Sequence, residues 1–135
     1  HYRKLIAQYH LENHVFLRGF IYDLNQEIET AYLSLLTSKM EGFNLGVLET
    51  IAKGVPTVSY DTKYGPSELI VNHKNGFLIE QDNKEQLYHS VKKLLLDSNL
   101  REQFSKESIK HAQIFNDKNV FDTWLTVFRT LKVNL

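Results

Sequence analysis

Short apolar runs alternate with segments of helical periodicity through the first 80 residues of the chain. The runs have the length of strands and fall at 15–20, 32–37, 57–60 and 77–79. Helices are predicted between them at 2–10, 23–30, 45–53 and 67–71. From residue 83 onward the pattern is helical only. This alternation predicts an α/β domain with a parallel sheet flanked by helices and closed off by extra helices at its C-terminal end.

Several predicted elements carry residues that favour their ends. Asp23 is expected to cap the second helix at its N-terminus, and Gly54 to end the third helix in a left-handed conformation. Asn75-Gly76 predicts a turn before the last strand. The run at 32–37 is apolar at most positions, which is typical of a strand that is buried on both faces.

The composition is that of one packed globular domain without net charge. Of the 135 residues, 42% are hydrophobic, and 16 basic residues balance 16 acidic ones. A chain of this length has room for one domain with a core, but not for two ordinary ones. Because the chain has no net charge, its overall charge gives no reason to expect binding to nucleic acid or an anionic membrane. Any phosphate that it binds must be held by groups placed close together in the fold.

The chain contains no cysteine, which excludes disulfides and thiolate metal ligands and fits a reducing compartment. The sequence shows neither the run of about 18 apolar residues that a membrane span needs nor a signal peptide. A cytoplasmic location without membrane insertion is therefore expected, and peripheral association of the whole protein with a membrane stays open. The helical start at His1 and the missing initiator methionine indicate a piece of a longer protein.

Two loops that combine glycine with carboxylates follow predicted strands, at residues 38–44 and 61–68. The carboxyl ends of parallel strands share one edge of the sheet, and ligands bind there where the strand order reverses. This coincidence is the main indication of a binding site.

The first loop leads into a motif in which Glu41 and Glu49 stand eight residues apart. Both would lie on roughly one side if the loop continued the helical spiral. Gly42 and Gly46 let the backbone approach a ligand, and free N–H groups near Leu45 at the helix start favour an anion. The carboxylates could accept hydrogen bonds from hydroxyls at either end of a diphosphate. Spacing alone leaves open the commoner case of two solvated glutamates at a helix start.

The sequence Ser38-Lys-Met-Glu-Gly-Phe-Asn-Leu-Gly-Val-Leu-Glu-Thr-Ile-Ala-Lys-Gly-Val-Pro-Thr-Val resembles the E-x7-E signature of the family 4 retaining glycosyltransferases of GT-B fold. The usual family pattern is S-x-x-E-G-F-G-x-x-x-L-E-A-M-A-x-G-x-P-V-V. The likeness extends, in the same order, to Val15-Phe-Leu-Arg-Gly-Phe, Pro66-Ser-Glu-Leu-Ile and Asn75-Gly-Phe-Leu-Ile. It implies that residues 1–135 are a single nucleotide-sugar-binding domain with a Rossmann-like sheet, the C-terminal half of a GT-B enzyme.

The resemblance also implies roles for individual residues. Glu41 matches the catalytic-site glutamate that contacts the donor sugar, and Glu49 matches the one that holds the ribose. Glu68 would support the same pocket from the second loop. The backbone groups that would lie against the sugar and the diphosphate belong to Gly42, Phe43, Asn44 and Leu45. No metal ion or other cofactor is implied.

Part of the enzyme is expected to precede His1. The acceptor domain lies there in the family, together with a strand-helix segment whose arginine and lysine neutralise the donor diphosphate. The resemblance therefore implies that the isolated chain is inactive and binds the donor weakly. The acceptor would be recognised by the other domain.

Two departures from the family pattern matter. Asn44 stands where the family commonly has glycine, and it is expected to keep the turn because asparagine tolerates a left-handed backbone. The second loop reads Tyr60-Asp-Thr-Lys-Tyr-Gly-Pro-Ser-Glu. This variant resembles the branch that glycosylates teichoic-acid polyol-phosphate chains of the cell wall, and related transferases that act on serine-rich surface proteins. It implies transfer of a hexose or N-acetylhexosamine from a nucleotide diphosphate sugar, by default a UDP-sugar, to an acceptor hydroxyl.

Other functions stay open beside this one. Another nucleotide-sugar user of the same fold is the main alternative among enzymes. A non-catalytic α/β nucleotide-binding module or partner subunit of a glycosyltransferase complex is a further alternative, against which the presence of both Glu41 and Glu49 argues. A receiver domain would need clustered aspartates at strand ends, and only Asp61 fits that pattern.

Two further patterns have simpler explanations. His10 and His14 are spaced for a metal site on a helix, but no third ligand is near, so surface histidines are expected. The apolar stripe of the last helix consists of Val120, Trp124, Val127, Phe128 and Leu131. It predicts a core-facing helix; the alternative is a helix that crosses to the N-terminal domain, as the last helix of a GT-B fold often does.

Overall fold

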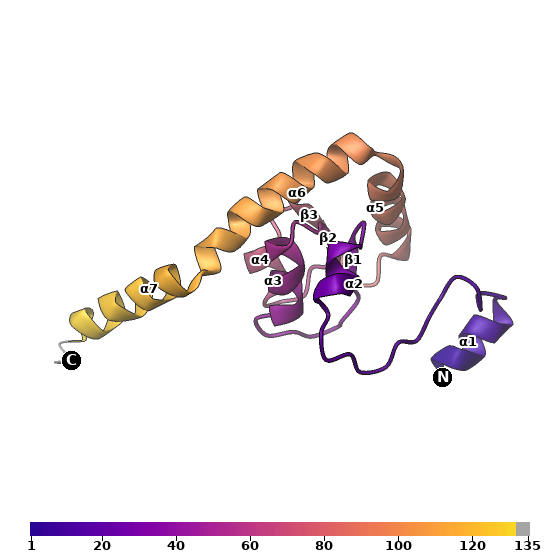
Figure 1. Ribbon diagram of the computed structural model, residues 1–135, viewed down its shortest axis with the longest axis horizontal. Helices are drawn as coiled ribbons and strands as arrows, with labels where there is room; N and C mark the ends of the chain where they lie inside the picture. The colour runs from indigo at the N-terminus through magenta and orange to yellow at the C-terminus, as the bar shows by residue number, and fades with distance from the viewer. Residues whose placement is uncertain (132–135) are drawn as a thin grey trace.

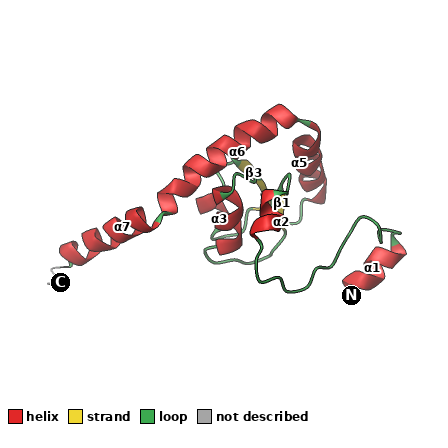
Figure 2. Cartoon of the chain, viewed as in Figure 1, coloured by secondary structure: helices red, strands yellow, loops and turns green. Residues whose placement is uncertain are grey.

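Three parallel strands form the centre of the molecule, in the order β1-β2-β3 (Figures 1 and 2). Their bounds are Ser34–Leu36 for β1, Thr57–Tyr60 for β2 and Gly76–Ile79 for β3. The computed structural model describes residues 1–131. Ser34 aligns with Thr57, and Thr57 aligns with Gly76. The carboxyl ends of all three strands therefore lie at one edge, which confirms the predicted parallel sheet.

Helices cover both faces of this sheet and extend beyond it. They are α1 (Tyr2–Gln8), α2 (Asn25–Glu29), α3 (Leu45–Ala52), α4 (Pro66–Leu69), α5 (Lys84–Leu96), α6 (Ser98–Ala112), the 3₁₀ helix η1 (Gln113–Phe115) and α7 (Asp117–Thr130). Figure 1 shows α1 and α7 apart from the sheet, at opposite ends of the molecule. Among residues 1–131, no helix has the length and apolar character that a membrane crossing requires.

Each face of the sheet has its own hydrophobic core, because alternate side chains of a strand point to opposite faces. One core contains Val58, Tyr60, Phe77, Ile79, Leu94 and Phe104. The other contains Val47, Ile51, Leu69, Ile70 and Ala112. The helix α6 contributes to both cores, and its Ser108 hydroxyl donates to the carbonyl oxygen of Asn75 at 3.2 Å. This helix thus ties the two layers together near the start of β3.

One predicted element end is confirmed by the backbone, and another lies one residue away from its predicted place. Gly54 follows α3 with a φ of 75°, and a Cβ on it would lie 2.6 Å from the Ser105 hydroxyl oxygen, so the position requires glycine. The Asp23 carboxylate accepts the N–H of Asn25 at 2.9 Å at the start of α2, although the residue in the cap position is Leu24.

Two predictions about strands are wrong. Residues 15–20 are exposed and irregular, with a φ of 69° at Gly19. An apolar run becomes a strand only where a neighbouring strand pairs with it, and the side chain of Arg18 instead forms an exposed ion pair with Glu27 of α2. β1 lies at the edge of the sheet, so its Leu35 is 50% exposed rather than buried on both faces.

The apolar stripe of α7 does not pack into the core, contrary to the first expectation. Trp124 is 56% exposed, and its ring stacks on that of Phe128 of the same helix. α7 is anchored at its start, where the Asn119 side chain donates to the Gln113 carbonyl oxygen at 2.8 Å. The helix leaves the body in Figure 1.

Candidate functional site

The two glycine-containing loops lie directly against each other at the carboxyl edge of the sheet. Gly65 begins α4 with a φ of 88°, and a Cβ on it would overlap the carbonyl oxygen of Gly42. The backbone nitrogen of Asn44 is also close, 3.6 Å from that Cβ position. Only glycine fits at residue 65, both for its backbone angle and for the space available.

Asn44 begins α3 as its N-cap. Its side-chain oxygen accepts the N–H of Val47 at 2.9 Å, and its φ of −85° is extended, so the expected left-handed backbone is wrong. An asparagine directly before an apolar helical segment is the ordinary signal of such a cap. The N–H groups of Leu45 and Gly46 find no acceptor among residues 1–131, so both are available to an anion at the helix start.

Asn44→Ala is expected to lower the free energy of unfolding by about 1 kcal/mol, because the N–H of Val47 loses its acceptor. Asn44→Asp keeps an acceptor oxygen and should retain most of the stability. Urea denaturation of the 135-residue chain, followed by circular dichroism, measures both variants. Equal stability of the alanine and aspartate variants would contradict the capping role.

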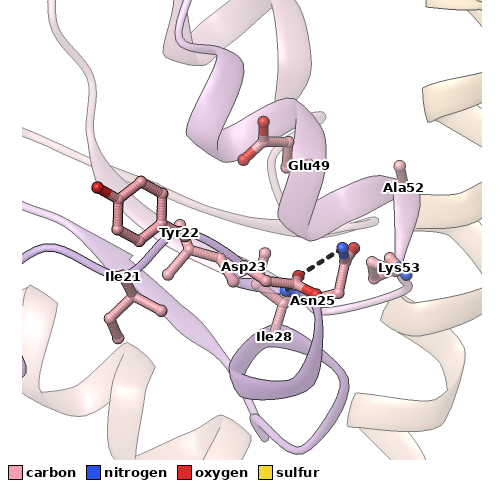
Figure 3. Close-up of a pocket in the computed structure, with 9 residues that line it drawn as sticks. Ile21, Tyr22, Asp23, Asn25, Ile28, Glu49, Ala52 and Lys53 are labelled. Atoms are coloured by element: carbon pink, nitrogen blue, oxygen red, sulfur yellow. Dashed lines mark hydrogen bonds between the residues drawn. The ribbon is translucent and has the colours of Figure 1, made fainter.

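The two glutamates of the motif lie in different surroundings. Glu41 is partly buried in a loop that is not helical, so the assumption that the loop continues the spiral of α3 is wrong. Glu49 is exposed on α3 and lines a pocket between this helix and residues 21–28 (Figure 3). Glu41 lies outside that pocket, next to the contact between Gly42 and Gly65.

The pocket beside Glu49 has a volume of about 360 Å³, within the usual size range of small-molecule sites. Its lining consists of Ile21, Tyr22, Asp23, Leu24, Asn25, Ile28, Glu49, Ala52 and Lys53. The ring of Tyr22 is 97% exposed, and Figure 3 shows the Glu49 carboxylate on the side of α3 that faces it. An exposed aromatic ring beside a carboxylate can stack on a flat ligand group while the carboxylate binds hydroxyls.

Carboxylates dominate the hydrogen-bonding chemistry of this pocket. The backbone and side-chain N–H groups of Asn25 bind the Asp23 carboxylate and hold its pKa below the ordinary value. The ammonium group of Lys53 is paired with Glu29 at 2.6 Å. Two carboxylates and a neutralised lysine suit the hydroxyl and amide donors of a ligand better than its phosphates. A phosphate is better placed at the start of α3.

Two further residues of the predicted site, Phe43 and Glu68, contact the C-terminal helices. The Phe43 ring lies 5.4 Å from that of Phe115 in η1. Glu68 has an exposed side chain, and its carbonyl oxygen lies 3.0 Å from Nε2 of His111. Leu45 is exposed at the first position of α3. Of the residues predicted from the sequence, Gly42 and Asn44 lie at the contact between the two loops, and Glu49 lines the pocket.

The walls of the pocket were not predicted from the sequence. Residues 21–25 carry no motif, and Asp23 attracted notice only as a helix cap. Their place beside Glu49 results from how α2 and the residues before it fold against α3. A stretch containing Tyr22, Asp23 and Asn25 is rich in side chains that bind polar ligands, which is the one signal the sequence offers.

Histidines form no metal site in the described part of the chain. Within residues 1–131, no three His, Asp or Glu side chains come close enough together to hold an ion. His10 and His14 are exposed, as expected of surface histidines.

A family model described as "Glycosyl transferases group 1" matches residues 1–111. The chain is 34% identical over 122 residues to poly(glycerol-phosphate) alpha-glucosyltransferase of Bacillus subtilis (strain 168), covering 90% of this chain and 18% of that protein. It is 30% identical over 128 residues to poly(ribitol-phosphate) alpha-N-acetylglucosaminyltransferase of Staphylococcus aureus (strain COL), covering 94% and 26%. The chain thus spans about a quarter or less of the length of these relatives.

Solved structures share the fold. A crystal structure of an S. aureus TarM mutant in complex with Fondaparinux, alpha-GlcNAc-glycerol and UDP matches with a TM-score of 0.87 at 30% identity, covering 93% of this chain and 26% of that one. The pneumococcal O-GlcNAc transferase GtfA in complex with UDP and GlcNAc matches with a TM-score of 0.84 at 25% identity, covering 98% and 27%.

Proposed function

Because this chain belongs to the group 1 glycosyl transferases, we propose that it is the donor-binding domain of a two-domain retaining enzyme. In this proposal the whole protein works in the cytoplasm and transfers a hexose or N-acetylhexosamine from a UDP-sugar to an acceptor hydroxyl. The similarity to poly(glycerol-phosphate) and poly(ribitol-phosphate) transferases confirms the resemblance noted in the second loop. It supports a teichoic-acid polyol phosphate as the acceptor, with a surface glycoprotein as the alternative.

The observation that most supports the proposal is that three features lie in succession along α3. They are the carboxylate-lined pocket, the unbonded N–H groups at the helix start and the contact between the two glycine loops. Glu49 lies four residues after Leu45, or about 6 Å along the helix axis. A nucleoside in the pocket would place its ribose hydroxyls at Glu49 and its base near Tyr22. The diphosphate would then reach the N–H groups of Leu45 and Gly46. The sugar would follow, at Glu41.

The proposed chemistry is a substitution at the anomeric carbon with retained configuration. The acceptor oxygen bonds to that carbon as its bond to the diphosphate oxygen breaks on the same face, and the leaving phosphate takes the acceptor proton. Glu41 accepts hydrogen bonds from the sugar hydroxyls and orients the ring without attacking it. Helix N–H groups stabilise the charge that develops on the diphosphate, so the proposal requires no metal ion.

A titration of the 135-residue chain with UDP, followed by heteronuclear NMR, tests this proposal. We expect the shifts to concentrate on the amides of residues 21–25, 42–49 and 65–68. Glu49→Ala should weaken UDP binding by about ten- to 150-fold, because a hydrogen bond to a charged group is worth roughly 1.5–3 kcal/mol.

The matched control for that variant is Glu85→Ala, which removes an exposed carboxylate from α5 and should leave the UDP affinity unchanged. The expected affinity of the wild-type chain is low, because the family's arginine and lysine lie on an earlier segment. A longer piece of the protein, extended toward the N-terminus, should bind more tightly. The proposal is wrong if neither piece responds to millimolar UDP.

A further inference from the structure

Both site loops are connected to the junction of α6 and η1 by direct contacts. Nε2 of His111, in the last turn of α6, lies 3.0 Å from the carbonyl oxygen of Glu68. The His111 ring also packs edge-on against Phe115, with 5.8 Å between the ring centroids. Phe115 in turn lies 5.4 Å from Phe43 of the first loop. One residue pair at this junction therefore contacts both loops.

These contacts lie at the surface of the molecule, and each of them gives one loop a defined neighbour. A carbonyl oxygen only accepts hydrogen bonds, so Nε2 of His111 carries the proton that it donates to Glu68. The helix α4 has four residues, so its last carbonyl groups are bound from outside the helix. The Asn75 side chain donates to the Leu69 carbonyl oxygen, and His111 donates to that of Glu68. Phe115 is partly buried against the core formed around α3 and α4. The short helix α4 thus gains His111 as a neighbour, and the exposed first loop gains Phe115.

The two loops also contact each other directly. The carbonyl group of Gly42 rests on Gly65, which leaves no space between the first loop and the start of α4. We expect a shift at the start of α4 to reach the first loop through this contact.

We propose that His111 and Phe115 are positioning residues that hold Glu41 and the start of α4 in the arrangement that binds the donor. His111 fixes α4 through Glu68, and Phe115 fixes the first loop through Phe43. The inference rests on the proposed function, since it assigns to these two residues the geometry of the donor site. Neither residue contacts the reacting atoms.

The test compares His111→Ala, His111→Gln and Phe115→Leu in the 135-residue chain. We expect His111→Ala to shift the amides of residues 42–44, which are not in contact with it, and to weaken UDP binding about three- to tenfold. Glutamine places an amide nitrogen near the position of Nε2, so His111→Gln should restore the UDP affinity to within about twofold. Phe115→Leu should shift the same amides and weaken UDP binding to a similar extent.

His89→Ala is the matched control, because His89 is an exposed histidine on α5 whose nearest acidic group, on Glu85, is 3.9 Å away. It should change neither the loop amides nor the UDP affinity. If His111→Ala unfolds the chain, Phe115→Leu decides between the outcomes, because it keeps an apolar side chain in the core.

A purely stabilising role gives a different result. His111→Ala would then lower the free energy of unfolding, with shifts confined to the residues around positions 68 and 111 and an unchanged UDP affinity. That outcome would overturn the inference and leave the proposed function intact. If the wild-type chain and its N-terminally extended form do not bind UDP, the proposed function fails. Whether His111 is coupled to the loops is then decided by the amide chemical shifts of the variants, which are measured without a ligand.

Discussion

Gly65→Ala is expected to lower the free energy of unfolding of the chain by about 3 kcal/mol. The backbone angles at this residue, φ 88° and ψ −71°, cost a residue with a Cβ roughly 1–3 kcal/mol. The new methyl group would also overlap the Gly42 carbonyl group, and displacing backbone in a packed region costs typically 1–3 kcal/mol. Urea denaturation followed by circular dichroism measures the loss.

Gly42→Ala is the matched control, since it adds the same methyl group to the other loop of the contact. A Cβ on Gly42 would meet no atom within 4 Å, so the stability should change by less than about 0.5 kcal/mol. Similar losses in the two variants would contradict the close approach of the loops. In the whole protein, Gly65→Ala should also weaken donor binding, because it separates the loop of Glu41 from α4.

Glu41→Gln is expected to lower the kcat of the whole enzyme by about ten- to 150-fold. Glutamine has the shape of glutamate but no charge, and a charged hydrogen bond to a sugar hydroxyl is worth roughly 1.5–3 kcal/mol. The affinity for UDP itself should stay the same, because UDP lacks the sugar that Glu41 is proposed to contact. Steady-state kinetics with a UDP-sugar, combined with a UDP titration, separates the two effects.

Glu85→Gln serves as the control for this variant, because Glu85 is an exposed glutamate on α5, away from both loops. Its turnover should equal that of the wild type. Near-normal turnover of Glu41→Gln would remove Glu41 from the reaction. A large loss of UDP affinity in the same variant would instead place Glu41 at the nucleotide.

The elements that the sequence predicts well are those whose local signals agree with their final surroundings. β2 was expected at 57–60 and is found there, buried at every position between two layers of helices. Gly54 ends α3 in the expected left-handed conformation because α6 leaves no space for a side chain beside it. In these cases the residue pattern and the tertiary contacts favour the same structure.

Predictions failed where burial depends on a partner that a local pattern does not contain. The apolar residues at 15–20 have the composition of a strand but no neighbouring strand. The stripe around Trp124 has the periodicity of a core helix, although α7 leaves the body. Hydrophobic periodicity reports which face of an element is apolar, and not what lies against that face.

The candidate site was also predicted only in part. The motif from Glu41 to Glu49 predicted the first loop and the start of α3. The walls of the pocket, with Tyr22 and Lys53, arise from the packing of a distant segment against α3 and were missed. At Asn44 the local signal of a helix cap was present, but comparison with the family's glycine led to the wrong backbone conformation.

The position of β1 has a consequence for the behaviour of the chain in solution. Within residues 1–131, only one side of this strand is paired, with β2. The other side presents backbone donors and acceptors next to the half-exposed Leu35, which is the kind of edge that recruits a strand from another molecule. Two copies of this chain can satisfy those groups by pairing edge to edge. A segment that paired with the free side of β1 would therefore also protect the molecule from self-association.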